Sequence, residues 1–227
     1  MASQGLNTVA GRIQRPVPLR EAVYEAILDL ITTRALSPGQ HLVETELAQT
    51  LGVSRQPVRE AMQRLNNEGW VDLRPGYGAF VHTPTESEAD QLLAVRALLE
   101  TESARLAAAN ASTEQVGYLR ELVAAGRAAT ELADTDAVVQ ANADFHRTVT
   151  EASGNRVLAE LAAQVDRRVR WYYAPVARIR GAASWDEHAN LVDVIEAGDA
   201  DQALRLMSEH TERTRRTYHE RVDGIGS

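Results

Sequence analysis

The segment Leu47–Trp70, LAQTLGVSRQPVREAMQRLNNEGW, decides the fold of the first part of this chain. Its apolar residues recur at helical spacing in two short runs, which predicts one helix over about 44–51 and a second that begins after Ser54 and ends near Glu68. Gly52 lies between the two runs, in a turn where a positive φ is often required and glycine adopts it without strain. This arrangement predicts a helix-turn-helix.

The second helix of this segment is expected to bury one face and expose the other. Its apolar stripe consists of Val58, Ala61, Met62 and Leu65. The opposite face carries Arg55, Gln56 and Arg59, and such side chains hydrogen-bond to guanine edges, adenine edges or phosphates. Ser54 is a good N-cap, and a helix N-terminus also suits a phosphate oxygen. The pattern predicts a DNA-reading helix; the alternative is the solvated face of an ordinary small helical domain.

A β-hairpin is predicted directly after this helix. Residues 70–73 and 79–81 alternate like two strands, and a tight glycine-containing turn joins them. Gly76 and Tyr77 lie at its tip, where glycine allows the backbone to approach DNA closely. Together with a further helix before the segment, these elements predict a winged helix-turn-helix of three helices plus a hairpin wing over residues 17–82.

The remainder of the chain is expected to be helical. Residues 1–16 show no periodicity and are predicted to form a flexible arm, residues 83–86 form a linker, and residues 223–227 form a tail. Between linker and tail the composition shifts to Ala, Leu and Glu without a strand signal, which predicts an all-α bundle over residues 87–222. Helices are expected near 86–109, 113–132, 135–153, 156–179, 185–197 and 200–222. The fold class is therefore mainly α.

The distribution of charge bears on the partner of each part. The chain has a formal net charge of −8, yet residues 1–82 contain eight Arg and eight acidic residues, so the excess of acid lies in the second part. A local basic face is sufficient for binding phosphates. Cysteine is absent, which excludes disulfides and thiolate metal sites. No signal peptide or membrane-spanning run is visible, so we expect a cytoplasmic protein without a membrane partner.

Histidines in the second part suggest a metal site. Asn142 and His146 are four residues apart and share one face of a predicted helix, while His188 and His210 lie on two later helices. Neutral imidazole is a common ligand for zinc, nickel and similar divalent ions. The spacing therefore permits a divalent metal held by these four residues. Spacing alone equally permits separate, partly buried histidines whose hydrogen bonds are satisfied.

Residues 17–82 resemble the N-terminal domain of the GntR family of bacterial regulators. The resemblance is carried by LREAVYEAILDLI and by LSPGQHLVETELAQTLGVSRQPVREAMQRLNNEGWVDLRPGYGAFV. It implies operator contacts from Arg55, Gln56 and Arg59, and entry of Gly76 into the minor groove. Thr45 departs from the pattern, because some members have a basic DNA-contacting residue at this position.

Residues 86–222 resemble the FCD ligand-binding domain of the FadR subfamily. The matching stretches are AVRALLETESARLAA (Ala94–Ala108), NADFHRTVTEASGN (Asn142–Asn155) and DEHANLVDVIEAGDADQALRLMSEH (Asp186–His210). Many such domains bind a divalent metal through one Asp and three His. The histidines correspond to His146, His188 and His210, whereas the Asp is replaced by Asn142, whose neutral amide oxygen is expected to weaken metal binding.

The same resemblance assigns Arg96 to the effector pocket. A guanidinium at this position is expected to pair with an effector carboxylate, with the metal polarising the same or a neighbouring oxygen. The alternative is a surface salt bridge with Glu100, which lies four residues later on the same predicted helix.

These observations predict a homodimeric transcription regulator, repressor or activator, rather than an enzyme. It would bind a double-stranded DNA operator, and a small organic acid would alter its operator affinity. Two alternatives remain at this point. One is a metal-dependent hydrolase with an accessory helix-turn-helix domain. The other is a regulator whose metal serves only folding and dimerisation, without an effector.

Overall fold

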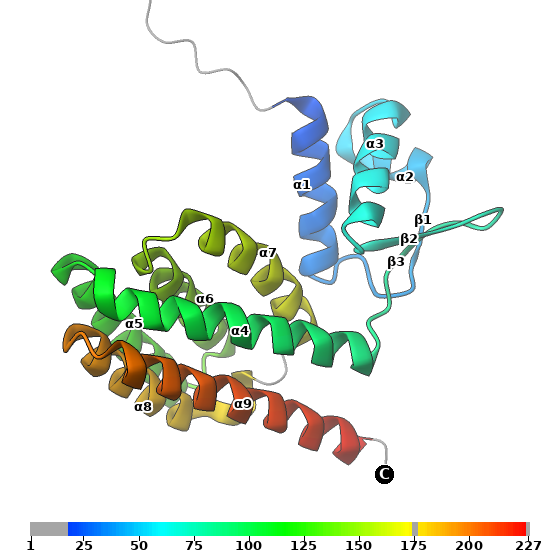
Figure 1. The fold of residues 1–227 in the computed structure, drawn as a ribbon. Helices are drawn as coiled ribbons and strands as arrows, with labels where there is room; N and C mark the ends of the chain where they lie inside the picture. Colours follow the sequence, from blue (N-terminus) through cyan, green and yellow to red (C-terminus); the bar gives the residue numbers. More distant parts are fainter. Residues whose placement is uncertain (1–17, 174–176, 226–227) are drawn as a thin grey trace, which may run out of the picture. The chain divides into compact units, whose positions relative to one another are not determined.

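The computed structural model describes residues 18–173 and 177–225, and these residues form two compact units (Figure 1). The first unit ends at Thr83 and the second begins at Pro84. Helices predominate in both units, which confirms the mainly α fold class. The predicted flexible arm, residues 1–16, lies outside the described residues. Among the described helices, none combines the length and apolar character needed to cross a bilayer.

The first unit contains the predicted helix-turn-helix with a small sheet. Its elements in chain order are α1 (Leu19–Thr32), β1 (His41–Leu42), α2 (Glu44–Leu51), α3 (Arg55–Asn67), β2 (Val71–Arg74) and β3 (Gly78–Val81). Fully buried aliphatic side chains form its core: α1 contributes Ile27 and Ile31, and α3 contributes Val58 and Leu65. The apolar stripe expected on the second helix of the motif is thus the buried face of α3.

The turn between α2 and α3 has the expected backbone and an unexpected cap. Gly52 ends α2 with φ of 66°, the left-handed conformation that glycine adopts without a Cβ clash. Ser54 occupies the N-cap position of α3 with extended dihedrals, but its side chain makes no capping hydrogen bond. Ser54 is therefore at the N-cap position, as predicted, but its side chain does not form the expected hydrogen bond to the backbone of α3. The Ser54 hydroxyl is exposed at the start of the helix.

The hairpin wing, β2 and β3, is part of a three-stranded antiparallel sheet in the order β1-β3-β2. Val71 of β2 is opposite Val81 of β3, and His41 of β1 is opposite Phe80 on the other side of β3. The sequence analysis did not predict β1, because two residues are too short to show an alternating pattern. Gly78 is required beside it: its φ is +99°, and a Cβ there would lie 2.6 Å from Nε2 of His41.

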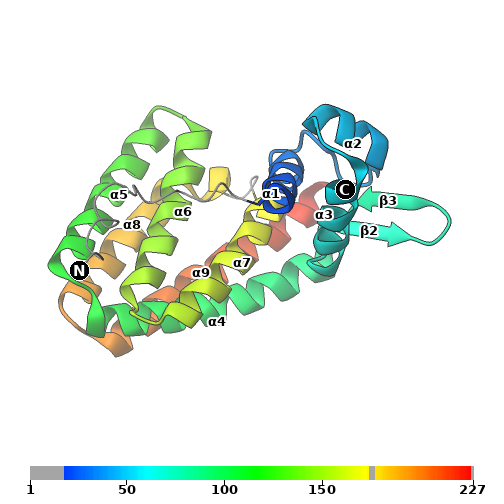
Figure 2. The same cartoon turned by 90° about the horizontal axis from the view of Figure 1, so that it is seen from above.

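The second unit is a bundle of long helices. They are α4 (Glu86–Asn110), α5 (Thr113–Glu131), α6 (Thr135–Ala152), α7 (Arg156–Tyr173), α8 (Ala177–Glu196) and α9 (Ala200–Ile225). Helices α4 and α9 run side by side along its length (Figures 1 and 2). Thr85 and Ser112 begin α4 and α5 with capping boxes, in which each side chain and the third helical residue satisfy each other's backbone N–H groups.

Three predicted boundaries differ from the structure. The helix expected over residues 156–179 is observed as α7, which is described as far as Tyr173, while residues 177–179 belong to α8. Helix α8 begins at Ala177 instead of near residue 185 and includes Gly181 in its interior. A glycine inside a helix costs only about 1 kcal/mol, and tertiary packing readily offsets that amount. Helix α9 extends to Ile225 and includes part of the predicted tail.

Trp185 anchors α8 against α5. It is 1% exposed and among the largest fully buried side chains of the described residues. Its ring lies directly over Gly126, where a Cβ would overlap the indole carbons, and its Nε1 donates a hydrogen bond of 3.1 Å to Oγ1 of Thr130. The absence of a side chain at Gly126 therefore permits the close packing of the two helices.

Replacing Gly126 by alanine is expected to destabilise the second unit. The new methyl group must displace a rigid, buried indole, and such overpacking costs about 1–3 kcal/mol of unfolding free energy. Gly117→Ala is the matched control on α5, because nothing lies within 4 Å of a Cβ at that position. This control should instead gain about 0.5–1 kcal/mol from helix propensity. Urea unfolding monitored by circular dichroism measures both; equal stability of the two variants would contradict the packing argument.

Candidate functional site

The exposed face of α3 presents the three residues assigned to base recognition. Arg55 and Arg59 have side chains that are 58% and 57% exposed. Gln56 is also exposed and donates a hydrogen bond of 2.9 Å to Oε1 of Glu60, one turn later on the same helix. All three side chains are thus on the surface of the first unit, opposite the buried stripe, as the helical spacing predicted.

Glu44, the first residue of α2, connects the two arginines. Nε and Nη2 of Arg59 donate hydrogen bonds of 2.9 and 2.8 Å to its two carboxylate oxygens, and Nη2 of Arg55 donates one of 3.1 Å. The hydrogen bonds from Arg59, with the one from Arg55, lower the pKa of the Glu44 carboxyl to about 2. The sequence analysis missed Glu44, because separations of 11 and 15 residues give no helical-spacing signal.

These side chains border an open groove of about 610 Å³ between α3 and the wing. Its lining includes His41, Glu44, Thr45, Arg55, Arg59, Arg74 and Gly76. Gly76 has φ of 78° in the hairpin turn, and Tyr77 beside it is 78% exposed. The groove therefore brings together basic side chains from the recognition helix and from the wing.

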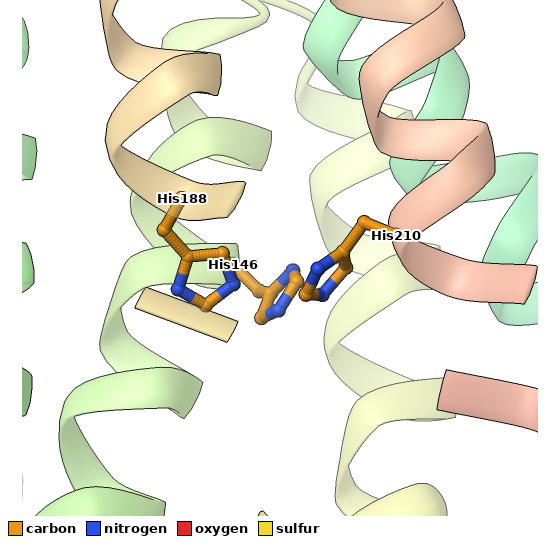
Figure 3. A group of neighbouring side chains, drawn as sticks. All are labelled: His146, His188 and His210. Carbon is orange, nitrogen blue, oxygen red and sulfur yellow. The ribbon is translucent and has the colours of Figure 1, made fainter. Parts of the chain in front are cut away.

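The second unit contains a buried triad of histidines (Figure 3). His146 from α6, His188 from α8 and His210 from α9 are 3%, 1% and 6% exposed. One ring nitrogen from each can be chosen so that the three atoms lie within 4.8 Å of one another. The tertiary structure thus brings together three side chains that are far apart in the sequence.

The ring nitrogens of this triad fit a metal ion. Both nitrogens of His146 and both of His188 are buried and have no hydrogen-bond partner. Burial lowers the pKa of each of these two rings well below its usual range, so both are neutral and carry a lone pair. Buried polar atoms of this kind are normally satisfied, and a bound cation is one way to satisfy them. Asn142 lies one turn before His146 on α6 and is partly buried.

Aromatic rings surround the triad on one side. The ring of Phe145 stacks on His188 with centroids 4.1 Å apart, and the indole of Trp185 meets His188 edge-on at 5.0 Å. These two contacts restrict the orientation of the His188 ring. Trp185 also provides an intrinsic fluorophore beside it.

A buried ion pair lies on the other side of His146. Nε of Arg96 donates a hydrogen bond of 2.7 Å to Oε1 of Glu100, and the two side chains are only 11% and 7% exposed. The same oxygen is 3.2 Å from Nδ1 of His146, although without hydrogen-bond geometry, and Oε2 of Glu100 has no partner. Burial raises the pKa of Glu100, against the opposing effect of Arg96. The salt bridge with Glu100, which was the alternative to a pocket role for Arg96, is present, but it is buried and not on the surface.

A cavity of about 260 Å³ adjoins this ion pair. Helices α4, α6 and α7 enclose it, and its lining includes Arg96, Glu100, His146, Arg147, Thr150, Ala162 and Asp166. His146 belongs to both the triad and the cavity wall. A small molecule in the cavity would therefore contact Arg96 and a triad histidine at the same time.

Glu187, which the sequence analysis also missed, contacts the triad from α8. Nδ1 of His210 lies within hydrogen-bond distance of its Oε2, at 2.7 Å. Burial opposes ionisation of Glu187, but the hydrogen bonds from His210 and Arg180 outweigh it and lower its pKa to about 2. The available signal was its position directly before His188, since carboxylates commonly orient ligand histidines.

Comparison with known families agrees with both units. Residues 19–81 match the family described as bacterial regulatory proteins, gntR family, and residues 91–213 match the FCD domain. RspR, an HTH-type transcriptional repressor of Escherichia coli strain K12, is 26% identical over 89% of this chain and 90% of its own. NanR, an HTH-type transcriptional repressor of another E. coli strain, is 26% identical over 88% of this chain and 84% of its own.

Solved structures share the fold. A GntR transcriptional regulator from Rhodococcus sp. RHA1 superposes with a TM-score of 0.71 at 23% identity, covering 86% of this chain and 95% of its own. E. coli McbR/YncC gives a TM-score of 0.69 at 22% identity, covering 90% and 99%. The family matches do not favour the alternative of a metal-dependent hydrolase. The chain belongs to the GntR family of bacterial regulators, as a DNA-binding transcription regulator with an FCD domain.

Proposed function

We propose that this regulator is a homodimeric repressor whose operator affinity is controlled by a small organic acid bound beside a divalent metal in the FCD domain. The observation that carries this proposal is the shared position of His146, which belongs both to a buried histidine triad and to the wall of an adjacent cavity. RspR and NanR are named as repressors, which supports the direction of control.

In the DNA complex, α3 would lie in the major groove. Arg55, Gln56 and Arg59 would contact base edges or phosphates, and the Ser54 hydroxyl, which makes no cap bond, would be available to a phosphate oxygen. Glu44 holds the two guanidinium groups together before DNA arrives, which reduces the conformational entropy lost on binding. Gly76 and Tyr77 would reach the adjacent minor groove from the wing.

The metal would be held by His146, His188 and His210, with the amide oxygen of Asn142 as a fourth ligand. Zinc, nickel and similar ions accept such neutral donors. When bound, the metal would supply a positive charge that polarises an effector carboxylate. The replacement of a carboxylate by Asn142 removes one negative charge, so a weaker site is expected than in domains that have Asp at this position.

The effector would occupy the 260 Å³ cavity, which is below the range of about 300–1,000 Å³ that accommodates drug-sized ligands. A molecule of a few carbon atoms fits this size. The carboxylate of the effector would bind the guanidinium of Arg96. This guanidinium already donates a hydrogen bond to the carboxylate of Glu100. Charge-assisted bonds of this kind are strong in a buried site.

Two such chains would form the functional unit, because paired recognition helices read the two halves of a pseudo-palindromic operator. Exposed apolar side chains are available for this contact on neighbouring helices. They are Val95 and Leu98 on α4, and Val157 and Leu161 on α7.

Arg59→Ala is expected to weaken specific DNA binding. Loss of one bidentate base contact costs about 1–3 kcal/mol, or roughly 5- to 150-fold in affinity. Titration of an operator fragment selected from random DNA by the wild-type protein measures this loss. Arg156→Ala, at an arginine that is 89% exposed in the second unit, is the control and should bind normally. Equal affinities would refute the assignment of α3, and one chain per duplex would refute the dimer.

His146→Ala combined with His210→Ala should abolish metal binding, since only one triad ligand remains. Elemental analysis after loading with zinc or nickel and dialysis measures the bound ion, with about one per wild-type chain expected. His219→Ala is the control, because this α9 histidine is exposed and pairs with Asp90 outside the triad. Unchanged metal content in the double variant would place the ion elsewhere.

Arg96→Ala should remove the response to the effector and leave operator binding intact. A screen of small organic acids by thermal unfolding, with and without added metal, identifies stabilising ligands; at 100 times the dissociation constant the gain is about 2.7 kcal/mol. Arg105→Ala, at an α4 arginine paired with Glu102 on the surface, is the control. If both variants respond alike, Arg96 has no role in effector binding. If no acid or metal stabilises the wild type, the effector proposal fails.

A further inference from the structure

His210 differs from the other two histidines of the triad in one respect. Both ring nitrogens of His146 and His188 lack a hydrogen-bond partner, whereas Nδ1 of His210 is 2.7 Å from Oε2 of Glu187. Glu187 is on α8, directly before His188, and its side chain is 19% exposed. The carboxylate of Glu187 is thus next to His188 in the sequence and contacts His210 in the tertiary structure.

The carboxylate of Glu187 is itself held in place. Nη2 of Arg180 donates a bond of 2.5 Å to Oε2, and Nε of Arg213 forms an ion pair of 2.8 Å with Oε1. Arg180 is 9% exposed and also donates through Nη1 to the backbone carbonyl of His210, at 3.1 Å, and to Oγ1 of Thr214. These contacts fix the carboxylate against the turn of α9 that carries His210.

This arrangement determines which nitrogen of His210 carries the proton. A neutral imidazole has one N–H, and an ionised carboxylate can only accept hydrogen bonds. Oε2 of Glu187 therefore selects the tautomer in which Nδ1 is protonated. Nε2 then retains its lone pair and is the atom of His210 that can bind a cation. Without the carboxylate, the proton could occupy either nitrogen.

We infer that Glu187 is a positioning residue of the triad, which holds His210 in the Nδ1–H tautomer so that Nε2 is ready to coordinate a divalent metal. This inference rests on the proposed metal site. It also explains why a partly buried carboxylate accompanies three neutral rings. Partners of this kind fix ring orientation and raise the basicity of the coordinating nitrogen, and their loss typically weakens metal binding 10- to 100-fold.

Two substitutions separate this role from that of a simple ion pair between α8 and α9. Glu187→Ala removes the acceptor, so the Nδ1–H tautomer should be lost and zinc or nickel should bind about 10- to 100-fold more weakly. Glu187→Gln removes the charge but keeps an amide oxygen that can accept the same hydrogen. It should retain the tautomer and bind metal more tightly than the alanine variant. Asp186→Asn is the control, because this neighbouring carboxylate pairs with Arg127 on the surface.

Two measurements on the full chain give the outcome. The ¹⁵N chemical shifts of the histidine rings in the metal-free protein report the tautomer of His210, and titration with zinc or nickel alone reports affinity. Protonation of Nε2 in the wild-type protein would overturn the inference. So would glutamine and alanine variants with equal metal affinity and an unchanged tautomer, since an ion pair is lost in both.

Failure of the proposed metal site would be recognised separately. A wild-type protein that binds neither zinc nor nickel refutes metal binding, and it also refutes the coordinating role given to Nε2. The ring shifts would still show whether Glu187 selects the tautomer. If the alanine variant does not fold, the wild-type shifts and the glutamine variant remain decisive.

Discussion

The burial of three neutral imidazoles is the constraint on which the second unit depends. Four of their ring nitrogens, on His146 and His188, have no hydrogen-bond partner. Each unsatisfied buried polar group costs about 1–3 kcal/mol, a large amount beside the roughly 5–15 kcal/mol that stabilises a typical domain. The surrounding apolar core of α4, α5, α6, α8 and α9 must offset this cost. The proposed metal ion would satisfy ring nitrogens of this kind.

A chain of charged side chains leads outward from the triad. Glu187 satisfies His210, and Arg180 and Arg213 in turn satisfy Glu187. On the opposite side, the pair of Arg96 and Glu100 lines the adjacent cavity together with His146. On the first side of the triad, Glu187 is thus hydrogen-bonded to His210 and Arg180, and Arg213 adds an ion pair. The other side retains an unpartnered carboxylate oxygen on Glu100, at the wall through which a ligand would be recognised.

In the first unit the charged groups are exposed, whereas those around the triad are largely buried. Its arginines are exposed, and Glu44 gathers Arg55 and Arg59 at the groove without burying them. An exposed ion pair contributes little to stability, so phosphates or bases can replace Glu44 at small cost. The net charge of −8 is no obstacle, because its acidic excess lies outside residues 1–82. DNA binding depends on this local surface and not on the charge of the whole chain.

The local sequence pattern was sufficient to predict much of the secondary structure of this protein. The helix-turn-helix followed from Gly52, Ser54 and the apolar stripe of α3, because helical periodicity and turn chemistry are encoded by neighbouring residues. Features that depend on contacts between residues far apart in the sequence became visible only in the tertiary structure. Strand β1 exists only through its pairing with β3. Glu44 contacts Arg55 across 11 residues, and Glu187 contacts His210 across 23 residues. Spacing in sequence permitted a histidine site; only the packing of α6, α8 and α9 brought the three rings together.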